Sequence, residues 1–180
     1  MWRSLVVAAL GALAATACGK TTNVTPADVA LQFYVTLELG GVREVPEPRA
    51  LIAIEPYLTP ALAGDLKAAR ARRDAPLPPG STDKPPFTDG NPFSSLFEGH
   101  STYRMGTTAM RGDTALVTVS FSNIQQKPAV EWKDTVLLLP HGTGASRSWR
   151  VDDIRYGSTW EFGYRGSLRG VLQGGVSAER

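Results

Sequence analysis

Apolar residues recur at helical spacing near the start of the chain. Four of them fall at intervals of three and four residues, which places them on one face of a helix. They are Ala30, Phe33, Tyr34 and Leu37. The preceding segment Thr25-Pro26-Ala27-Asp28 offers a capping hydroxyl, a proline at the first helical position and an acid three residues after the cap. Gly40-Gly41 follows the run, so the pattern predicts a helix that starts at Pro26 and ends before the glycines.

Two more helices are expected before residue 74. One covers Pro48 to Ile54, and the next begins at the cap pair Thr59-Pro60. This third helix turns three apolar side chains inward: Leu62, Leu66 and Ala69. Its basic residues are Lys67, Arg70, Arg72 and Arg73. We interpret the basic run as a solvated helix face and not as a binding patch, because charges on helices usually face water.

The segment at residues 74–92 is rich in Pro, Gly, Ser and Asp. Pro78-Pro79-Gly80 and Pro85-Pro86 exclude regular structure, so a long loop is expected here. Loops of this length inside a compact domain are often functional. We expect Phe87 and Phe93 to attach the ends of this loop to the core.

The second half of the chain changes to a period of two, which is typical of half-buried strands. Two strands alternate apolar and polar residues, with Ala115, Val117, Val119 and Phe121 in one and Val130, Trp132, Val136 and Leu138 in the other. Asp134 falls on the apolar side of the second strand. Tyr103 and Met105 belong to a strand before these two. Turns at residues 111–113, 125–128 and 140–146 predict antiparallel hairpins.

The last strand predicts a β-bulge. Trp149 and Val151 share one face by strict alternation, whereas Ile154 and Tyr156 share the other. One extra residue at Asp152-Asp153 reverses the side-chain register and brings all four apolar side chains to the core.

Two short segments outside the strands also have helical signals. In the first, Phe93 to Glu98, apolar residues at the spacing of one helical turn are expected to plug the end of the sheet, with Ser94 or Ser95 as a cap. The second, Ser158-Thr159-Trp160-Glu161, has the pattern of a capping box for a closing turn or helix. A short apolar tail follows, formed by Leu168, Val171 and Leu172.

Helices first and a bent antiparallel sheet afterwards predict an α+β fold. We expect the N-terminal helices to pack on a curved antiparallel sheet of about four strands, in a cone-like or roll-like arrangement. Residues 26–180 form this single domain in our interpretation. The chain has one cysteine, so it has no internal disulfide and its stability has to come from a packed core.

The first residues resemble the signal sequence of a bacterial lipoprotein. Arg3 supplies a positive start, an apolar core runs over residues 5–14, and Ala15-Thr16-Ala17-Cys18-Gly19 resembles a lipobox that ends in the acylated cysteine. The apolar core is too short to span a bilayer. We therefore expect residues 1–17 to be a signal peptide. Ordinary secretion is the alternative, because the segment before the cysteine is also an A-x-A cleavage site.

The lipoprotein interpretation also gives a location. Cys18 is the expected lipidation site, residues 18–25 are its tether, and the acyl chains make the lipid bilayer a partner. Gly19 stands where an Asp would resemble an inner-membrane retention signal, so in a Gram-negative host the resemblance implies the periplasmic face of the outer membrane. Lys and Arg total 19 against 17 Asp and Glu, and this near balance gives no indication of a nucleic-acid partner.

Three segments carry a resemblance to a known family: Lys84-Pro85-Pro86, Phe93-Ser94-Ser95-Leu96-Phe97-Glu98-Gly99 and Trp149-Arg150-Val151-Asp152-Asp153-Ile154-Arg155-Tyr156. Over nearly all of the mature chain, they resemble a bacterial family of small lipoproteins with a domain of unknown function. The order of elements is also similar to the cone-shaped α+β folds of nuclear-transport-factor-like, SnoaL-like and cystatin-like proteins. The resemblance implies a fold and an envelope location but no chemistry, because the activity of the family is unassigned.

Carboxylates are the candidate catalytic groups. With the bulge, Asp153 can turn inward beside Asp134, and a carboxylate in an apolar cone has a raised pKa and can act as a general base. The candidate pocket consists of Tyr103, Trp132, Asp134 and Asp153. In the alternative, which we favour, the bulge aspartates pair with Arg155 or Arg150 or accept backbone donors.

Other chemistry has little support in the sequence. His100 and His141 are far apart along the chain, and Cys18 is assigned to lipid, so we expect no metal, no cofactor and no Cys-His pair. We interpret His100 as a hydrogen-bonded bystander near the loop. Ser94-Ser95 lacks the G-x-S-x-G frame of a serine hydrolase.

Two functions from different classes remain. The first is a non-enzymatic envelope protein whose domain binds a protein, a glycan or a small apolar molecule. The second is an enzyme of isomerase or hydrolase type that uses Asp134 or Asp153 inside the cone. We favour binding, because no set of acid, base and nucleophile is evident.

Overall fold

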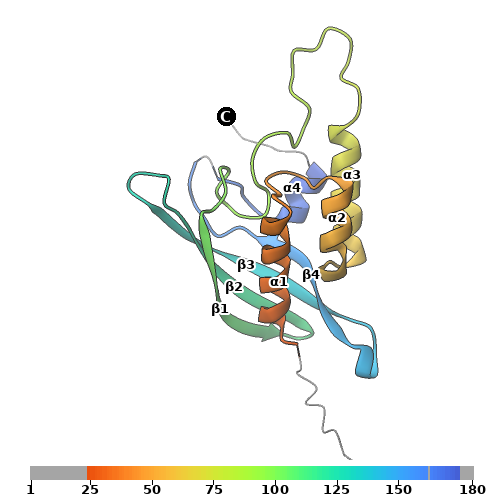
Figure 1. The fold of residues 1–180 in the computed structure, drawn as a ribbon, viewed down its shortest axis with the longest axis vertical. Helices are drawn as coiled ribbons and strands as arrows, with labels where there is room; N and C mark the ends of the chain where they lie inside the picture. Colours follow the sequence, from red (N-terminus) through yellow and green to blue (C-terminus); the bar gives the residue numbers. More distant parts are fainter. Residues whose placement is uncertain (1–23, 162, 175–180) are drawn as a thin grey trace, which may run out of the picture.

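The computed structural model describes residues 24–161 and 163–174, apart from the side chain of Ala145. Cys18 and the predicted signal peptide lie outside these residues. The described part is an α+β fold, as predicted, in which four helices accompany a four-stranded sheet (Figure 1). The helices are α1 (Pro26–Leu39), α2 (Pro48–Ile54), α3 (Pro60–Arg73) and α4 (Leu168–Gly174). The strands are β1 (Thr102–Arg111), β2 (Thr114–Asn123), β3 (Val130–His141) and β4 (Ser148–Arg155).

The strands pair in chain order, β1-β2-β3-β4, and all neighbours are antiparallel. The sheet is open and not closed into a barrel. On the face that we call inner, α1 packs against the sheet: the Tyr34 ring lies 5.5 Å from the Phe121 ring and 5.3 Å from the Tyr103 ring. Helices α3 and α4 contact each other and β4, beside α1 (Figure 1).

The predicted helix starts are confirmed. Thr25 and Asp28 form a reciprocal capping box at α1, because the Thr25 hydroxyl accepts from the Asp28 N–H and the Asp28 carboxylate accepts from the Thr25 N–H. The Thr59 hydroxyl caps α3 by accepting from the Leu62 N–H. All apolar residues assigned to the inward faces of α1 and α3 are buried.

The basic face of α3 is only partly solvated, which corrects the prediction for two of its residues. Arg73 pairs with Glu47 and Asp74, and its side chain is only 10% exposed. Arg70 lies 3.3 Å from a carboxylate oxygen of Asp74 and is also half-buried. Lys67 is exposed as expected, although it pairs with Glu55. The side chains of the two arginines are partly buried because their long alkyl stems can cover apolar surface while each guanidinium group stays next to an acidic partner.

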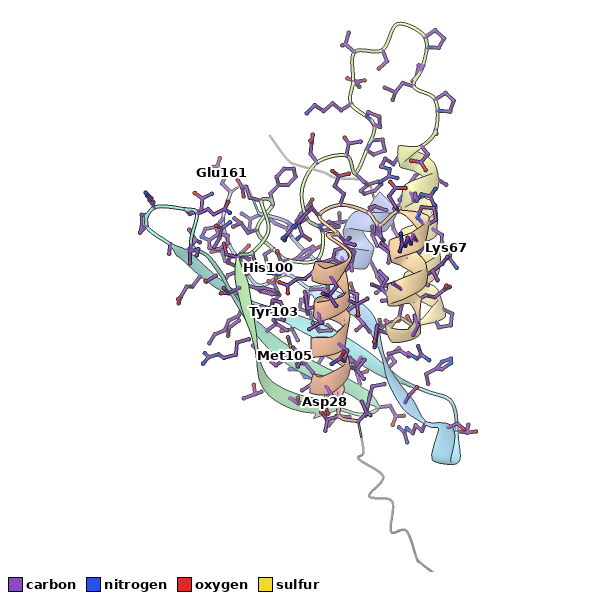
Figure 2. The ribbon with its side chains drawn as sticks, viewed as in Figure 1. Asp28, Lys67, His100, Tyr103, Met105 and Glu161 are labelled. Atoms are coloured by element: carbon purple, nitrogen blue, oxygen red, sulfur yellow. The ribbon has the colours of Figure 1, made fainter. Side chains whose placement is uncertain are left out.

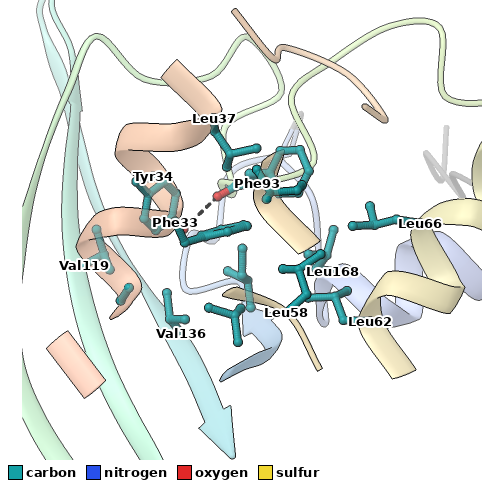
Figure 3. Close-up of a cluster of buried hydrophobic side chains, with 14 of the residues drawn as sticks. Phe33, Tyr34, Leu37, Leu58, Leu62, Leu66, Phe93, Val119, Val136 and Leu168 are labelled. Carbon is teal, nitrogen blue, oxygen red and sulfur yellow. Dashed lines mark hydrogen bonds between the residues drawn. The ribbon is translucent and has the colours of Figure 1, made fainter. Parts of the chain in front are cut away.

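Aromatic and aliphatic side chains together fill the space between α1 and the sheet (Figure 3). Phe33 and Tyr34 are fully buried, and Phe93 packs edge-on against Phe33 at 5.8 Å. The Tyr34 hydroxyl donates to the carbonyl oxygen of Phe93 at 2.9 Å, which satisfies the one polar atom of that ring. Phe87 and Phe93 are both buried, so the irregular loop at 74–92 is attached to the core as predicted.

The bulge predicted in β4 is present. Leu137 pairs with Asp153 and Leu138 pairs with Val151, which leaves Asp152 as the extra residue. Val151 and Ile154 are fully buried. Of the other two apolar residues of the pattern, Tyr156 is buried and Trp149 is half-buried. A single inserted residue thus puts all of them on the core side.

One helical expectation is wrong. The segment Phe93 to Glu98 is irregular, and Leu96 forms an isolated bridge with Gly163 instead of closing a helical turn. In this segment, long-range pairing replaces the local helical hydrogen bonds. Of the turn or helix expected at residues 158–161, the structure has the turn, in which the Gly163 N–H donates to the carbonyl oxygen of Trp160. The closing helix is α4, formed by the predicted apolar tail, with Leu168 and Leu172 fully buried.

Candidate functional site

A groove of about 820 Å³ lies on the sheet, and its exposed strand side chains are on the outer face, opposite α1. We call it the outer groove. It is lined by residues 102–104, 120–122, 131–133 and 157–160. The first three ranges belong to β1, β2 and β3, and the fourth follows β4.

Strand register arranges the outward side chains of the groove in two rows. Arg104 pairs with Ser120 and Ser120 with Lys133, which gives a charged row across three strands. Thr102, Ser122 and Glu131 are paired in the same way and give a hydroxyl row beside it. The residues between the rows have inward side chains and contribute mainly their backbone to the floor.

The charges of the outer groove have no partner in the described part of the chain. Arg104, Lys133 and Glu131 are exposed, and none of them takes part in an ion pair between described residues. The hydroxyl groups of Thr102 and Ser122 lie 3.1 Å apart in a hydrogen bond. The groove therefore presents two cations, one acid and several hydroxyl groups to solvent.

One wall of the groove depends on a glycine. After β4 the chain runs so close to β3 that a Cβ at position 157 would overlap the carbonyl oxygen of Lys133. Only glycine permits this approach without a shift of the backbone. Beyond it, the indole of Trp160 packs edge-on against that of Trp132, with ring centroids 5.4 Å apart. Trp160 is half-buried, so part of it remains exposed at the groove wall.

Asp134 lies on the inner face and does not line the groove. Its carboxylate accepts from the Ser95 N–H at 2.7 Å and the Gly157 N–H at 2.9 Å, and from the Trp132 indole N–H at 3.2 Å. The Ser95 hydroxyl also donates to it. Burial raises the pKa of Asp134 above its ordinary value, while these four donors act in the opposite direction. The carboxylate thus joins β3, the loop before β1 and the chain after β4.

The two bulge aspartates lie elsewhere, at the side of the sheet that α4 covers. Asp153 accepts from the backbone N–H of Ile154 and from that of Arg169, at 2.8 and 2.9 Å. Asp152 accepts from the Thr59 hydroxyl at 2.8 Å and lies 3.4 Å from the Arg169 guanidinium. Backbone donors at the bulge were expected, but the arginine partner is Arg169 and not a neighbour on the strand.

The candidate pocket predicted from the sequence is therefore divided in the structure. Tyr103 and Trp132 do line a common groove. Asp134 lies on the opposite face and Asp153 contacts α4, so the two carboxylates have separate partners, in line with the favoured alternative of a structural role. Sequence reasoning missed Arg104, Lys133 and the serines of β2, because outward polar positions on a single strand look like an ordinary solvated face. These residues could have been found only by comparing the outward positions of the three neighbouring strands together.

His100 is buried among aromatic rings, and the expectation that it is hydrogen-bonded is wrong. Its ring lies 4.8 Å from that of Phe121 and 5.4 Å from that of Tyr103. Neither ring nitrogen has a hydrogen-bond partner among the described residues, and the nearest carboxylate oxygen, on Glu38, is 3.7 Å from Nε2. Burial and the nearby positive charge of Arg43 lower the pKa of His100 to about 4.

Comparisons with protein-family models, curated proteins and solved structures find no match to this chain. The resemblance to the lipoprotein family stays a prediction. Among the described residues, no helix is long and apolar enough to cross a membrane. The same residues contain no cluster of three or more His, Cys, Asp or Glu side chains suited to a metal ion.

Proposed function

We propose that this chain is a lipid-anchored envelope protein whose α+β domain is a binding module, with the outer groove as its ligand surface. The observation that carries the proposal is the pair of rows in the groove, where three charged side chains are exposed without an ion-pair partner among the described residues and hydroxyl groups lie beside them. Convergent polar groups in a concave site are typical of ligand recognition.

The position of the groove relative to the predicted anchor supports this function. Cys18 precedes Thr25 by seven residues, and an extended chain of that length reaches at most about 25 Å. The lipid would thus hold the start of α1 close to the bilayer. Tyr103, in the groove floor, donates to Glu38 near the other end of α1, about 18 Å along the helix. Figure 2 labels Asp28 at the start of α1 and Tyr103 further along this helix, so the groove lies away from the start of α1.

The chemistry of the groove favours a polar ligand over the small apolar molecule considered from the sequence. The space under α1 is occupied by Phe33, Tyr34 and Phe93, and the exposed strand side chains of the groove are charged or carry hydroxyl groups. Catalysis by Asp134 has less support than binding, because four donors already engage its carboxylate.

A steric block of the groove tests this function. In the purified full chain in detergent, Ser120→Trp places a large ring in the charged row, between Arg104 and Lys133. Thr114→Trp is the matched control, because Thr114 lies on the same face of β2 but outside the groove. We expect a panel of neutral and acidic oligosaccharides, measured by isothermal titration calorimetry, to include a ligand that Ser120→Trp weakens at least about tenfold.

Two results would contradict the proposal. In one, no saccharide of the panel binds the parent protein. In the other, the Ser120→Trp and Thr114→Trp variants bind a ligand with equal affinity, so that the groove plays no part. Circular dichroism of both variants shows whether the fold is retained.

A further inference from the structure

We infer that the outer groove takes an acidic saccharide segment, with the negative group of the sugar over the charged row and its hydroxyl groups over the hydroxyl row. This inference rests on the proposed binding function and names the ligand class. It is carried by the order of side chains across the three strands.

The charged row provides the site for an anion. Arg104 and Lys133 stand on either side of Ser120, two strand spacings apart, which corresponds to about 10 Å. Two flexible cations at that separation can both reach one carboxylate or sulfate between them, and the Ser120 hydroxyl lies beneath it as a donor. Because neither cation has an ion pair in the described part of the chain, the anion has no protein acid to displace.

The hydroxyl row limits how much negative charge the ligand can carry. Glu131 lies next to Lys133 on β3 and is unpaired among the described residues, so it would repel a second anionic group placed near it. Its carboxylate and the hydroxyl groups of Thr102 and Ser122 are suited to sugar hydroxyl groups, which both donate and accept. The two rows together therefore match a sugar that carries one acidic group with hydroxyl groups next to it.

The groove wall adds a surface for the carbon skeleton of the sugar. Trp160 is partly exposed there and is fixed by its contact with Trp132. An indole that is held by packing presents a rigid apolar surface next to polar groups. This combination suits the mixed polar and apolar faces of a sugar ring.

An acidic peptide is the competing ligand, and the geometry favours it less. Peptides commonly bind by adding a strand to a free sheet edge or by placing side chains in apolar pockets. The groove floor consists of the paired strands β1, β2 and β3, so the backbone groups between these strands already bond to one another and the free edge of β1 lies only at the margin of the groove. The exposed strand side chains of the groove are charged or carry hydroxyl groups, and Trp160 adds an apolar surface at the wall but no enclosed apolar pocket for a side chain.

The test compares one ligand with and without its charge. Trigalacturonic acid and its full methyl ester have the same sugar skeleton, but only the first carries carboxylates. A hyaluronan tetrasaccharide and tetraglutamate complete the set of probes. We expect binding of an acidic saccharide to the full chain in detergent, at least about tenfold weaker binding of the ester, and weakening by added salt.

Variants locate the charge contact. Arg104→Gln and Lys133→Gln are each expected to weaken binding of the acidic saccharide about tenfold. Arg111→Gln removes the same charge from the exposed end of the same strand, outside the groove, and is expected to leave binding unchanged.

Each contrary outcome has a separate meaning. If the ester and the acid bind equally and both are sensitive to Ser120→Trp, the acidic ligand is overturned while the binding groove stands. If tetraglutamate binds and no saccharide does, the saccharide class is overturned. If Arg111→Gln weakens binding as much as Arg104→Gln does, a general charge effect replaces the specific site. If no probe binds, both this inference and the proposed function fail.

Discussion

Ser95 and Asp134 are joined by two hydrogen bonds, although 39 positions separate them in the chain. The Ser95 backbone N–H and its hydroxyl both donate to the Asp134 carboxylate. The same carboxylate accepts from Gly157, which belongs to the wall of the outer groove. One buried acid on the inner face thus holds a segment that shapes the outer face.

Removal of this acid is expected to destabilise the protein. Asp134→Ala leaves the buried Ser95 N–H and the Trp132 indole N–H without an acceptor, so we expect a loss of about 3 kcal/mol in the free energy of unfolding. Urea denaturation followed by tryptophan fluorescence measures it. Asp113→Ala, at an exposed turn, is the control and should change stability little. A loss below about 1 kcal/mol for Asp134→Ala would show that water replaces the carboxylate.

His100 is expected to make stability depend on pH. Its pKa is about 4 in the folded protein and near 6.5 in an unfolded chain. The unfolded state therefore takes up a proton first, and stability that is complete above pH 6.5 is lost as the pH falls toward 4. The difference of pKa corresponds to a loss of about 3 kcal/mol over that range.

Urea titrations at pH 7.5 and 4.5 check this prediction against a matched pair of variants. His100→Phe removes the titrating group and is expected to reduce the pH dependence by most of that amount. His141→Gln alters an exposed histidine at the end of β3 and is expected to keep the dependence of the parent protein. An equal change in the free energy of unfolding between the two pH values for the parent protein and for His100→Phe would refute the role of His100.

Gly157 is expected to be required for the groove wall. Gly157→Ala forces a methyl group against the Lys133 carbonyl oxygen, and such overpacking costs about 2 kcal/mol. Gly64→Ala is the contrasting substitution, because that glycine lies inside α3 with open space around it. It should stabilise the protein by about 0.8 kcal/mol through helix propensity. Thermal unfolding of the two variants should therefore shift in opposite directions, and a shift in the same direction would contradict this account of Gly157.

Membrane attachment is expected to depend on Cys18. Cys18→Ala removes the thiol that carries the acyl chains and should move the protein from the membrane fraction to the soluble fraction after cell lysis and ultracentrifugation. Labelling with a radioactive fatty acid should be lost at the same time. If the parent protein is already soluble and unlabelled, ordinary secretion replaces the anchor.

Much of the fold was predictable because its signals are local. The capping box of Thr25 and Asp28 involves residues three positions apart, and the alternation in β2 repeats every second residue. The bulge at Asp152 was also predictable, since a change of side-chain register is visible within one strand. These features depend on neighbours along the chain, and the residues themselves determine them.

The tertiary structure decided which distant residues meet. Ser95 looked like a helix cap in the sequence and instead binds Asp134, while Arg104, Ser120 and Lys133 became one row only through the register of three strands. His100 does not form the hydrogen bond expected from the sequence, because aromatic rings surround it. The sequence by itself determined the helices, the strands and the single cysteine. The ligand surface required the assembled sheet, because pairing between strands depends on the packing of the whole core and not on any local pattern.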